Sequence, residues 1–382
     1  MWIRQLLALD SGAMTTPREE LRPWTIDPDV RRAETLPAEV YSDPRWYALV
    51  RERVFARSWQ LVADHERMRN PGQTLPLAFL DGCVDEPLVL TRDRDDRLHC
   101  LSNVCTHRGA LVCDGPGVEQ QLRCRYHGRR FRLDGVFVSM PEFDEAEGFP
   151  RDGEEDLARL PLESWGPFLF TALEPLAPFA DWIGAVERRA GWLPLAEASF
   201  DAARSRDYLV HANWALYCDN YLEGFHIPFV HAALAAAVDY PSYRTELDRW
   251  SNVQVAVATG GEEAMEPPPG HPEHGKRVAA WYFWLFPNLM LNVYPWGISV
   301  NVVKPLAADR TRVSFLTYVW DESRLGGGAS ADLDRVERED EVVVESVQRG
   351  VGSRLYRRGR YSPTRETGVH HFHRLLGEQL AG

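Results

Sequence analysis

The sequence lacks several features that would assign the protein to common classes. Its 382 residues contain no run of 18 apolar residues, which a membrane-spanning helix would require. They contain no glycine-rich dinucleotide fingerprint, so we do not expect the chain to bind NAD(P)H itself. Basic residues are fewer than acidic ones, 43 against 56, and the net charge is −13. This balance argues against nucleic acid or an anionic membrane as the main partner.

Cysteine is also scarce. Six unevenly spaced cysteines in a chain of 382 residues do not form a disulfide framework, and they indicate metal ligands or free thiols in a reducing compartment. The first 14 residues are interrupted by Arg4 and do not have the pattern of a signal peptide, and Met14 is an alternative start. We therefore expect a cytoplasmic protein.

The length exceeds what one hydrophobic core usually spans, so we expect more than one domain. Changes in pattern predict an N-terminal arm over residues 1–40, a first domain over 41–165 and a second domain over 166–382. The first domain is predicted to begin with an N-terminal helix and otherwise to be a small all-β unit, because short strand-like segments separated by turn residues follow. The second combines helices with long strands over 279–306 and 311–320, which predicts an α+β fold with an antiparallel sheet.

Three helices are predicted from apolar spacing and capping residues. The first covers 43–59, with Asp43 as N-cap and a proline at its first position. The second covers 213–238, is capped by its first residue and is interrupted. The third covers 329–352, with Ser330 as N-cap. A single strand is predicted within 164–175, followed by a proline-rich break.

Residues 105–128, "CTHRGALVCDGPGVEQQLRCRYHG", are rich in cysteine and histidine. They offer four ligands in the pattern Cys-x-His, sixteen residues, Cys-x2-His: Cys105, His107, Cys124 and His127. Two thiolates and two imidazoles suit a zinc ion, or a [2Fe–2S] cluster with two Cys on one iron and two His on the other. Each half ends in glycine, which allows a tight turn over a cluster and favours iron. Cys113 falls outside the pattern and is predicted to be a buried thiol.

Such a cluster has no open coordination position, so a second metal site is expected. Glu223 and His226 are three residues apart and would share a helix face, whereas His226 and His231 would lie about 140° apart on an ideal helix. Pro228 lies between the histidines and is expected to break the helix, which lets His231 turn toward His226. Two imidazoles and one carboxylate form the facial triad of non-haem Fe(II) oxygenases.

The carboxylate is expected from the third predicted helix. Its apolar stripe consists of Val336, Val343, Val344, Val347 and Val351. Asp340 falls in the middle of this stripe, and a lone buried acid is costly unless it is paired or binds a metal. Three acids are predicted outside the stripe: Glu337, Glu341 and Glu345. Asp340 is therefore the predicted ligand, Glu339 at the stripe's edge is the reserve candidate, and an exposed Asp340 without a metal is the alternative.

Over most of its length the chain resembles the α subunits of Rieske non-haem iron oxygenases, the aromatic-ring-hydroxylating dioxygenase family. The segments "CTHRG" and "CRYHG" match the family's Rieske motif, and Glu223, His226 and His231 match its D/E-x2-H-x4-H motif. The resemblance implies an N-terminal all-β Rieske [2Fe–2S] domain and a C-terminal helix-grip (START-like) catalytic domain with an antiparallel sheet. It also implies that Asp340 is the distant carboxylate ligand of a mononuclear Fe(II).

The resemblance implies a role for Glu223 as well. It would connect His226 to His107 or His127 of a neighbouring subunit in a homotrimer, with Asp219 as the rival for this role. Electrons would come from NAD(P)H through a separate reductase or ferredoxin, and O2 would be the co-substrate. Glu223, "ESVQRG" and "VHHFH" are most similar to the branch of choline and carnitine monooxygenases and betaine demethylases. Arg129 stands where the family usually has Trp after "YHG", which puts the packing beside His127 and the surface shown to a neighbouring subunit in question.

We therefore expect an oxygenase component that hydroxylates or oxidatively dealkylates a small organic substrate, with a quaternary amine as the first choice. The aromatic run 281–296 could form a cage for a cation, or fill a half-buried pair of strands. The alternatives are a ring-hydroxylating or O-demethylating oxygenase of aromatic acids, a non-enzymatic Rieske redox or START-like binding protein, and a zinc-stabilised structural protein. His370, His371 and His373 are predicted to be structural or solvated.

Overall fold

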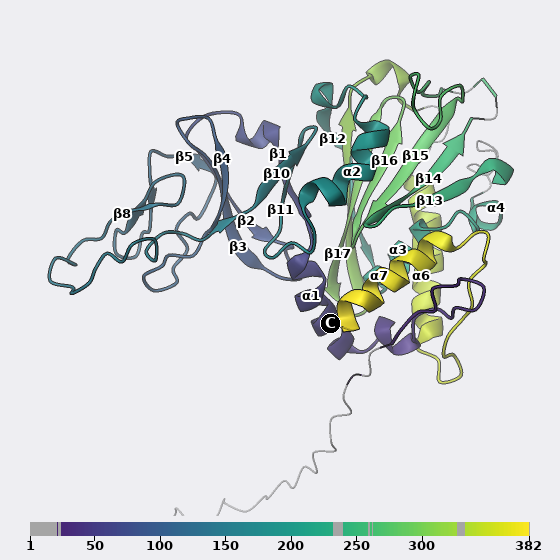
Figure 1. Cartoon of the computed structure of the whole chain (residues 1–382), viewed down its shortest axis with the longest axis horizontal. Helices are drawn as coiled ribbons and strands as arrows, with labels where there is room; N and C mark the ends of the chain where they lie inside the picture. Colours follow the sequence, from purple (N-terminus) through teal and green to yellow (C-terminus); the bar gives the residue numbers. More distant parts are fainter. Residues whose placement is uncertain are drawn as a thin grey trace, which may run out of the picture.

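The computed structural model describes residues 21, 24–231, 240–258, 260–261, 263–326 and 333–381. Figure 1 shows two regions side by side. Small sheets formed by the first half of the chain lie in one region. A large twisted sheet and its helices, formed by the second half, lie in the other. Ser330 and residues 232–239, for which a cap and a helix are predicted, lie outside the described residues.

The first helix begins where the sequence predicts it. A 3-10 turn η1 (Ala38–Tyr41) precedes α1 (Pro44–Arg53), and the Asp43 carboxylate accepts a hydrogen bond from the Arg45 N–H at 2.8 Å. The helix is shorter than predicted, because a separate 3-10 turn η2 (Phe55–Arg57) follows it.

The described part of the N-terminal arm packs against the end of the chain. Trp24 and Leu36 are buried in one hydrophobic cluster with Phe372 and Leu375 of α7 (Thr367–Ala381). The two termini of the described chain therefore stabilise the same side of the second region.

The first region is all-β, as predicted. Its strands are β1 (Gln60–Asp64), β2 (Gln73–Phe79), β3 (Glu86–Arg92), β4 (Leu98–Ser102), β5 (Gly117–Val118), β6 (Leu122–Arg123), β7 (Arg130–Phe131), β8 (Phe137–Ser139), β9 (Arg159–Leu160), β10 (Leu162–Trp165) and β11 (Phe168–Thr171). They form antiparallel sheets of order β5-β2-β3-β4-β9, β6-β7-β8 and β1-β11-β10. A 3-10 turn η3 (His65–Met68) follows β1. The single strand predicted within 164–175 is wrong: β10 and β11 form a hairpin around Gly166.

The second region is built on one seven-stranded antiparallel sheet of order β12-β18-β17-β16-β15-β14-β13. Its strands are β12 (Ser199–Val210), β13 (Arg244–Leu247), β14 (Ser251–Val257), β15 (Val278–Leu285), β16 (Leu289–Tyr294), β17 (Gly297–Ala307) and β18 (Arg310–Val319). The predicted strand segments 279–306 and 311–320 correspond to the last four of these strands. Short 3-10 turns are η4 (Leu195–Glu197), η5 (Tyr240–Ser242) and η6 (Glu322–Arg324).

Helices cover both faces of this sheet (Figure 1). They are α2 (Phe179–Ala190), α3 (Trp214–Tyr221), α4 (Ile227–Val230), α6 (Leu333–Val351) and α7. Along β15, Trp281 and Phe283 belong to the buried cluster that contains Trp182 of α2. The alternate residue Trp284 belongs to the cluster that contains Trp214 of α3. Because side chains of a strand alternate between faces, the sheet separates α2 from α3, α6 and α7.

Candidate metal centres

The two Cys–His loops of the first region have the same backbone geometry. The N–H of Gly109 donates to the carbonyl of Cys105, and the N–H of Gly128 donates to the carbonyl of Cys124, both at 3.0 Å. The φ angles of these glycines are 72° and 75°, which residues with a side chain rarely adopt. The glycine that ends each motif therefore closes the loop, as the sequence predicts.

The two loops face each other and bring their four predicted ligands together in pairs. Nδ1 of His107 lies 3.1 Å from Nδ1 of His127, and the thiols of Cys105 and Cys124 are buried. Burial raises the pKa of Cys105. Desolvation and then His127 lower the pKa of His107, which favours the neutral imidazole that binds metals.

This arrangement fits a two-iron cluster better than one zinc ion. Within the described residues, only one group of three or more His, Cys, Asp or Glu side chains has ligand atoms all within 4.8 Å, and it lies elsewhere. The four Rieske candidates do not converge on a single point. A histidine pair and a buried thiol pair are the ligand set of a Rieske cluster.

Cys113 and Arg129 lie beside the loops without joining the ligand set. The Cys113 thiol donates to the carbonyl of Gly115 at 3.2 Å, as expected for a bystander, but Cys113 is half-buried and not buried as predicted. Arg129 is 2% exposed, pairs with the buried carboxylate of Glu155, and has its guanidinium 4.7 Å from the ring centre of Phe137. The expectation that Arg129 changes a surface shown to a neighbouring subunit is therefore wrong. Its planar cation packs inside the domain against aromatic rings.

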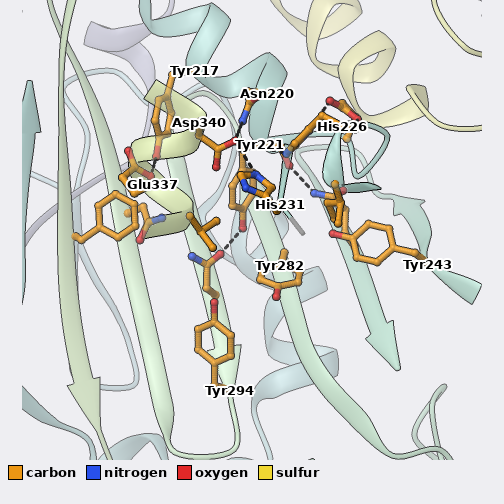
Figure 2. Close-up of a pocket in the computed structure, with 17 residues that line it drawn as sticks. Tyr217, Asn220, Tyr221, His226, His231, Tyr243, Tyr282, Tyr294, Glu337 and Asp340 are labelled. Carbon is orange, nitrogen blue, oxygen red and sulfur yellow. Dashed lines mark hydrogen bonds and ion pairs between the residues drawn. The ribbon is translucent and has the colours of Figure 1, made fainter. Parts of the chain in front are cut away.

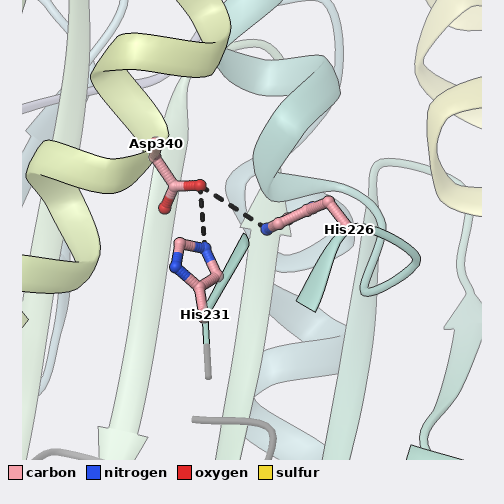
Figure 3. A group of neighbouring side chains, drawn as sticks. All are labelled: His226, His231 and Asp340. Carbon is pink, nitrogen blue, oxygen red and sulfur yellow. Dashed lines mark hydrogen bonds and ion pairs between the residues drawn. The ribbon is translucent and has the colours of Figure 1, made fainter. Parts of the chain in front are cut away.

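The second centre lies where α3, α4 and α6 meet (Figure 3). Nε2 of His231 is 3.0 Å from Oδ1 of Asp340, and Nε2 of His226 is 3.5 Å from the same oxygen. The three ligand atoms lie within 4.8 Å of one another. The structure thus brings together the two histidines and the distant acid that the sequence singles out.

The helix break that allows this meeting is not at Pro228. Helix α3 ends at Tyr221, and Pro228 lies in the first turn of α4, where its missing N–H costs no hydrogen bond. Asn213 caps α3 by accepting from the Ala215 N–H, as predicted. Glu223 lies in the break rather than on a helix face. Its carboxylate accepts from the N–H groups of Phe225 and His226, and this replaces helical hydrogen bonds.

Each histidine binds a carboxylate through Nδ1, which turns Nε2 toward Asp340. Nδ1 of His226 lies 2.6 Å from Glu223, and Nδ1 of His231 lies 2.8 Å from Glu339. Glu339, the reserve candidate for the ligand, thus contacts the outer nitrogen of His231, a predicted ligand, and not the centre itself. Such outer contacts fix the tautomer and the ring orientation of metal-binding histidines.

Two predicted features of this neighbourhood need correction. Asp219 does not compete with Glu223, because its carboxylate is 2.7 Å from Nε2 of His373 and also accepts from Tyr41.

The buried face of α6 is also rotated from the predicted stripe. Glu337 is 5% exposed, whereas Val347 is 43% exposed. The buried positions recur every seven residues, at Glu337, Val344 and Val351. The prediction missed this spacing because it followed the valines alone.

A cavity opens onto this centre (Figure 2). Tyrosines form much of its lining, and they are Tyr217, Tyr221, Tyr243, Tyr282 and Tyr294. Amide side chains also line it, and they are Asn220, Gln254, Asn292 and Asn301. Its acids are Glu223, Glu337 and Asp340, and the described lining contains no Lys or Arg. Sequence reasoning missed Glu337, Gln254 and the tyrosines of α3. Glu337 and Asp340 are one helical turn apart, and this spacing could have indicated that Glu337 shares the helix face of Asp340.

The C-terminal histidines are structural, as predicted. His370 and His373 are buried and bonded, the first to the carbonyl of Asp27 at 2.8 Å and the second to Tyr361 at 2.6 Å. Burial lowers the pKa of His371 to about 4. None of them belongs to a metal-type cluster within the described residues.

A two-iron ligand set in a small β unit, combined with two histidines and a carboxylate beneath a START-like sheet, defines the class of Rieske-type iron oxygenases. Comparison with known proteins agrees. Residues 58–150 match the Rieske [2Fe-2S] domain, and residues 195–382 match the ring hydroxylating alpha subunit (catalytic domain).

Among curated proteins, the chain is 31% identical to the chloroplastic choline monooxygenase of Arabidopsis thaliana over 379 residues, covering 93% of this chain and 85% of that protein. It is 30% identical to the carnitine monooxygenase oxygenase subunit of Escherichia coli K12 over 366 residues, covering 91% and 94%. A solved quaternary ammonium Rieske monooxygenase matches with a TM-score of 0.72 and 25% identity, covering 92% and 96% of the two chains. The naphthalene 1,2-dioxygenase of Rhodococcus sp. shares the fold, with a TM-score of 0.67, 18% identity, and coverage of 90% and 93%.

The chain therefore belongs to the family of Rieske non-haem iron oxygenase α subunits and is nearest in character to its choline and carnitine monooxygenase branch. The family carries a Rieske cluster and a mononuclear iron, and the two groups of side chains described above fit both. Within the described part of the chain, every helix is too short or too polar to span a bilayer.

Proposed function

We propose that this enzyme hydroxylates or oxidatively dealkylates a small quaternary amine, using O2 and electrons supplied by a separate protein. The observation that carries this proposal is the cavity, in which five tyrosines and two further acids, Glu223 and Glu337, surround the His226–His231–Asp340 group. Tyrosine rings attract cations through their faces. The expected cage forms only partly from the aromatic run 281–296, which contributes Tyr282 and Tyr294.

Asp340, His226 and His231 are the proposed iron ligands, and Cys105, His107, Cys124 and His127 are the proposed cluster ligands. When bound, the iron would supply O2 activation for attack on a C–H bond. The protein's part is to hold the ligands with Nε2 inward, to hold the substrate against tyrosine rings, and to exclude bulk water. Hydroxylation of a carbon next to nitrogen would form a C–O bond there, and the C–N bond would then break, which releases the amine and the former alkyl group as an aldehyde; this is an oxidative dealkylation.

We propose a homotrimer in which Glu223 connects His226 to a Rieske histidine of the neighbouring subunit. Figure 1 shows β8 at one end of the molecule and α3 and α4 at the other, so the two centres of one chain are far apart. The side chains beside each centre are exposed and apolar: Phe229 is 80% exposed and Tyr126 is 60% exposed. One solved relative is described in terms of inter-subunit electron transfer.

The electron donor is proposed to be an NAD(P)H-dependent reductase or a ferredoxin.

Cytoplasmic localisation is also a proposal, since several plant relatives are named chloroplastic. The division into an arm (1–40), a Rieske domain (41–165) and a catalytic domain (166–382) is likewise proposed. The β10–β11 hairpin spans residue 165 and favours a boundary after Thr171.

The test is turnover by the holoprotein with a supplied reductase. Choline, carnitine and glycine betaine would be compared with aromatic acids and aromatic ethers, and O2 consumption would be matched to product by mass spectrometry. We expect O2-dependent oxidation of at least one amine and none of the aromatic acids. Turnover of an aromatic acid alone would favour the aromatic oxygenase. A protein with both metals bound that oxidises no substrate would favour the non-enzymatic alternative.

A further inference from the structure

Glu337 is a buried carboxyl group that the proposed mechanism does not use. Its side chain lines the cavity from α6 and is 5% exposed (Figure 2). Oε2 accepts a hydrogen bond from the Tyr217 hydroxyl at 2.7 Å, but Oε1 is buried without a partner. An unpaired buried carboxylate oxygen is costly, so this oxygen indicates a missing positive or donating group.

A second acceptor in the same cavity is also without a partner. Nε2 of Gln254 donates to the carbonyl of Tyr221 at 2.6 Å, and this contact fixes the orientation of the amide. Its Oε1 is buried and has no hydrogen-bond partner. The cavity therefore offers one unpaired carboxylate oxygen and one unpaired neutral acceptor.

The charged side chains of the cavity lining also favour a cationic ligand. A divalent iron at the proposed centre would be balanced by Asp340 and Glu223, so no positive charge in the described lining remains to pair with Glu337. No Lys or Arg is among the described lining residues. A substrate carboxylate would have no cation to pair with here and would lie among acids.

We propose that the cavity selects a compact organic cation that carries no carboxylate, best an amino alcohol whose hydroxyl reaches Gln254, and that Glu337 is the residue that determines this specificity. The inference rests on the proposed amine oxygenase function and narrows its substrate class. Burial raises the pKa of Glu337, and the hydrogen bond from Tyr217 lowers it by less, so the net change is upward. A fixed positive charge in contact with the carboxyl lowers that pKa again, so the bound state is an ion pair.

The test is anaerobic isothermal titration calorimetry on the iron-loaded holoprotein with three probes of similar size. Choline carries the cation and a hydroxyl, 3,3-dimethylbutan-1-ol is its uncharged isostere, and glycine betaine adds a carboxylate. We expect wild-type protein to bind choline at least about tenfold more tightly than either other probe. In Glu337→Gln, which retains an acceptor for Tyr217, the advantage of choline over the isostere should fall to within about threefold.

Glu341→Gln is the matched control, because it removes the same charge from α6 at a residue outside the cavity lining. It should leave all three affinities unchanged. If Glu337→Gln does not fold, the wild-type affinities alone decide, since equal binding of choline and glycine betaine, or of choline and its isostere, overturns the inference. A folded Glu337→Gln that keeps the preference for choline overturns the role of Glu337. If the inference fails but the protein still oxidises amines, the proposed function stands. Oxidation of aromatic acids only would overturn both the inference and the proposed function.

Discussion

Replacing Glu339 tests whether the second centre is held as its geometry indicates. The Glu339 carboxylate is 2.8 Å from Nδ1 of His231 and its other oxygen accepts from Nε of Arg335 at 3.0 Å. His231 is 1% exposed, and its ring is oriented by this contact at Nδ1 together with the contact of Nε2 to Asp340, but the side chain of Glu339 is 28% exposed. Loss of a carboxylate that orients a metal-binding histidine typically weakens metal binding 10- to 100-fold.

Because solvent screens the partly exposed carboxylate, we expect the loss of metal affinity in Glu339→Ala to lie at the lower end of this range. The Fe(II) dissociation constant should rise about tenfold, equivalent to about 1.4 kcal/mol. Glu339→Gln should lie between wild type and alanine, since the amide oxygen still accepts from Nδ1–H but carries no charge. Competition with a ferrous chelator under anaerobic conditions would give the constants, and the visible absorption of the Rieske cluster would show that the first region is intact.

Glu341→Gln is again the control, one helical turn along from Glu337 and without a contact to either histidine among the described bonds. Two results would refute the reasoning. If Glu339→Ala removes iron completely, Glu339 is itself a ligand. If it leaves the dissociation constant unchanged, the contact to His231 has no part in orienting the ring.

The remaining predictions concern both centres. Asp340→Ala should abolish mononuclear iron binding while the Rieske spectrum is retained; iron analysis that still finds one mononuclear iron would place the ligand elsewhere. Glu223→Gln should retain both metals and slow turnover about tenfold or more; unchanged turnover would exclude a bridging role. Arg129→Met should lower the free energy of unfolding of the first region by about 1.5–3 kcal/mol, because Glu155 loses a charged hydrogen bond, as measured by urea unfolding. Cys113→Ser should leave the cluster spectrum unchanged; its loss would mean that this thiol is a ligand.

The ligand candidates could be selected from the sequence because metal ligation restricts residue type and spacing severely. Cys105, His107, Cys124 and His127 lie within 23 positions, and their glycines mark the closing turns. The position of the helix break could not be predicted in the same way. Pro228 is a strong local signal, yet the chain leaves the helix earlier, since Glu223 can satisfy the backbone N–H groups that helix α3 no longer pairs.

The amino-acid sequence alone predicts the two candidate ligand sets, the capped helices α1 and α3, and a distant acid on α6. Local chemistry decides these, since a motif or cap acts within a few residues. Three-dimensional packing was needed to establish which face of α6 is buried, that Arg129 packs inside the first region, and that Glu339 contacts the outer nitrogen of His231. It also decided that Glu337 faces a cavity with one oxygen unpaired. These features depend on which residues, distant in sequence, meet across packed elements, and no local pattern encodes that meeting.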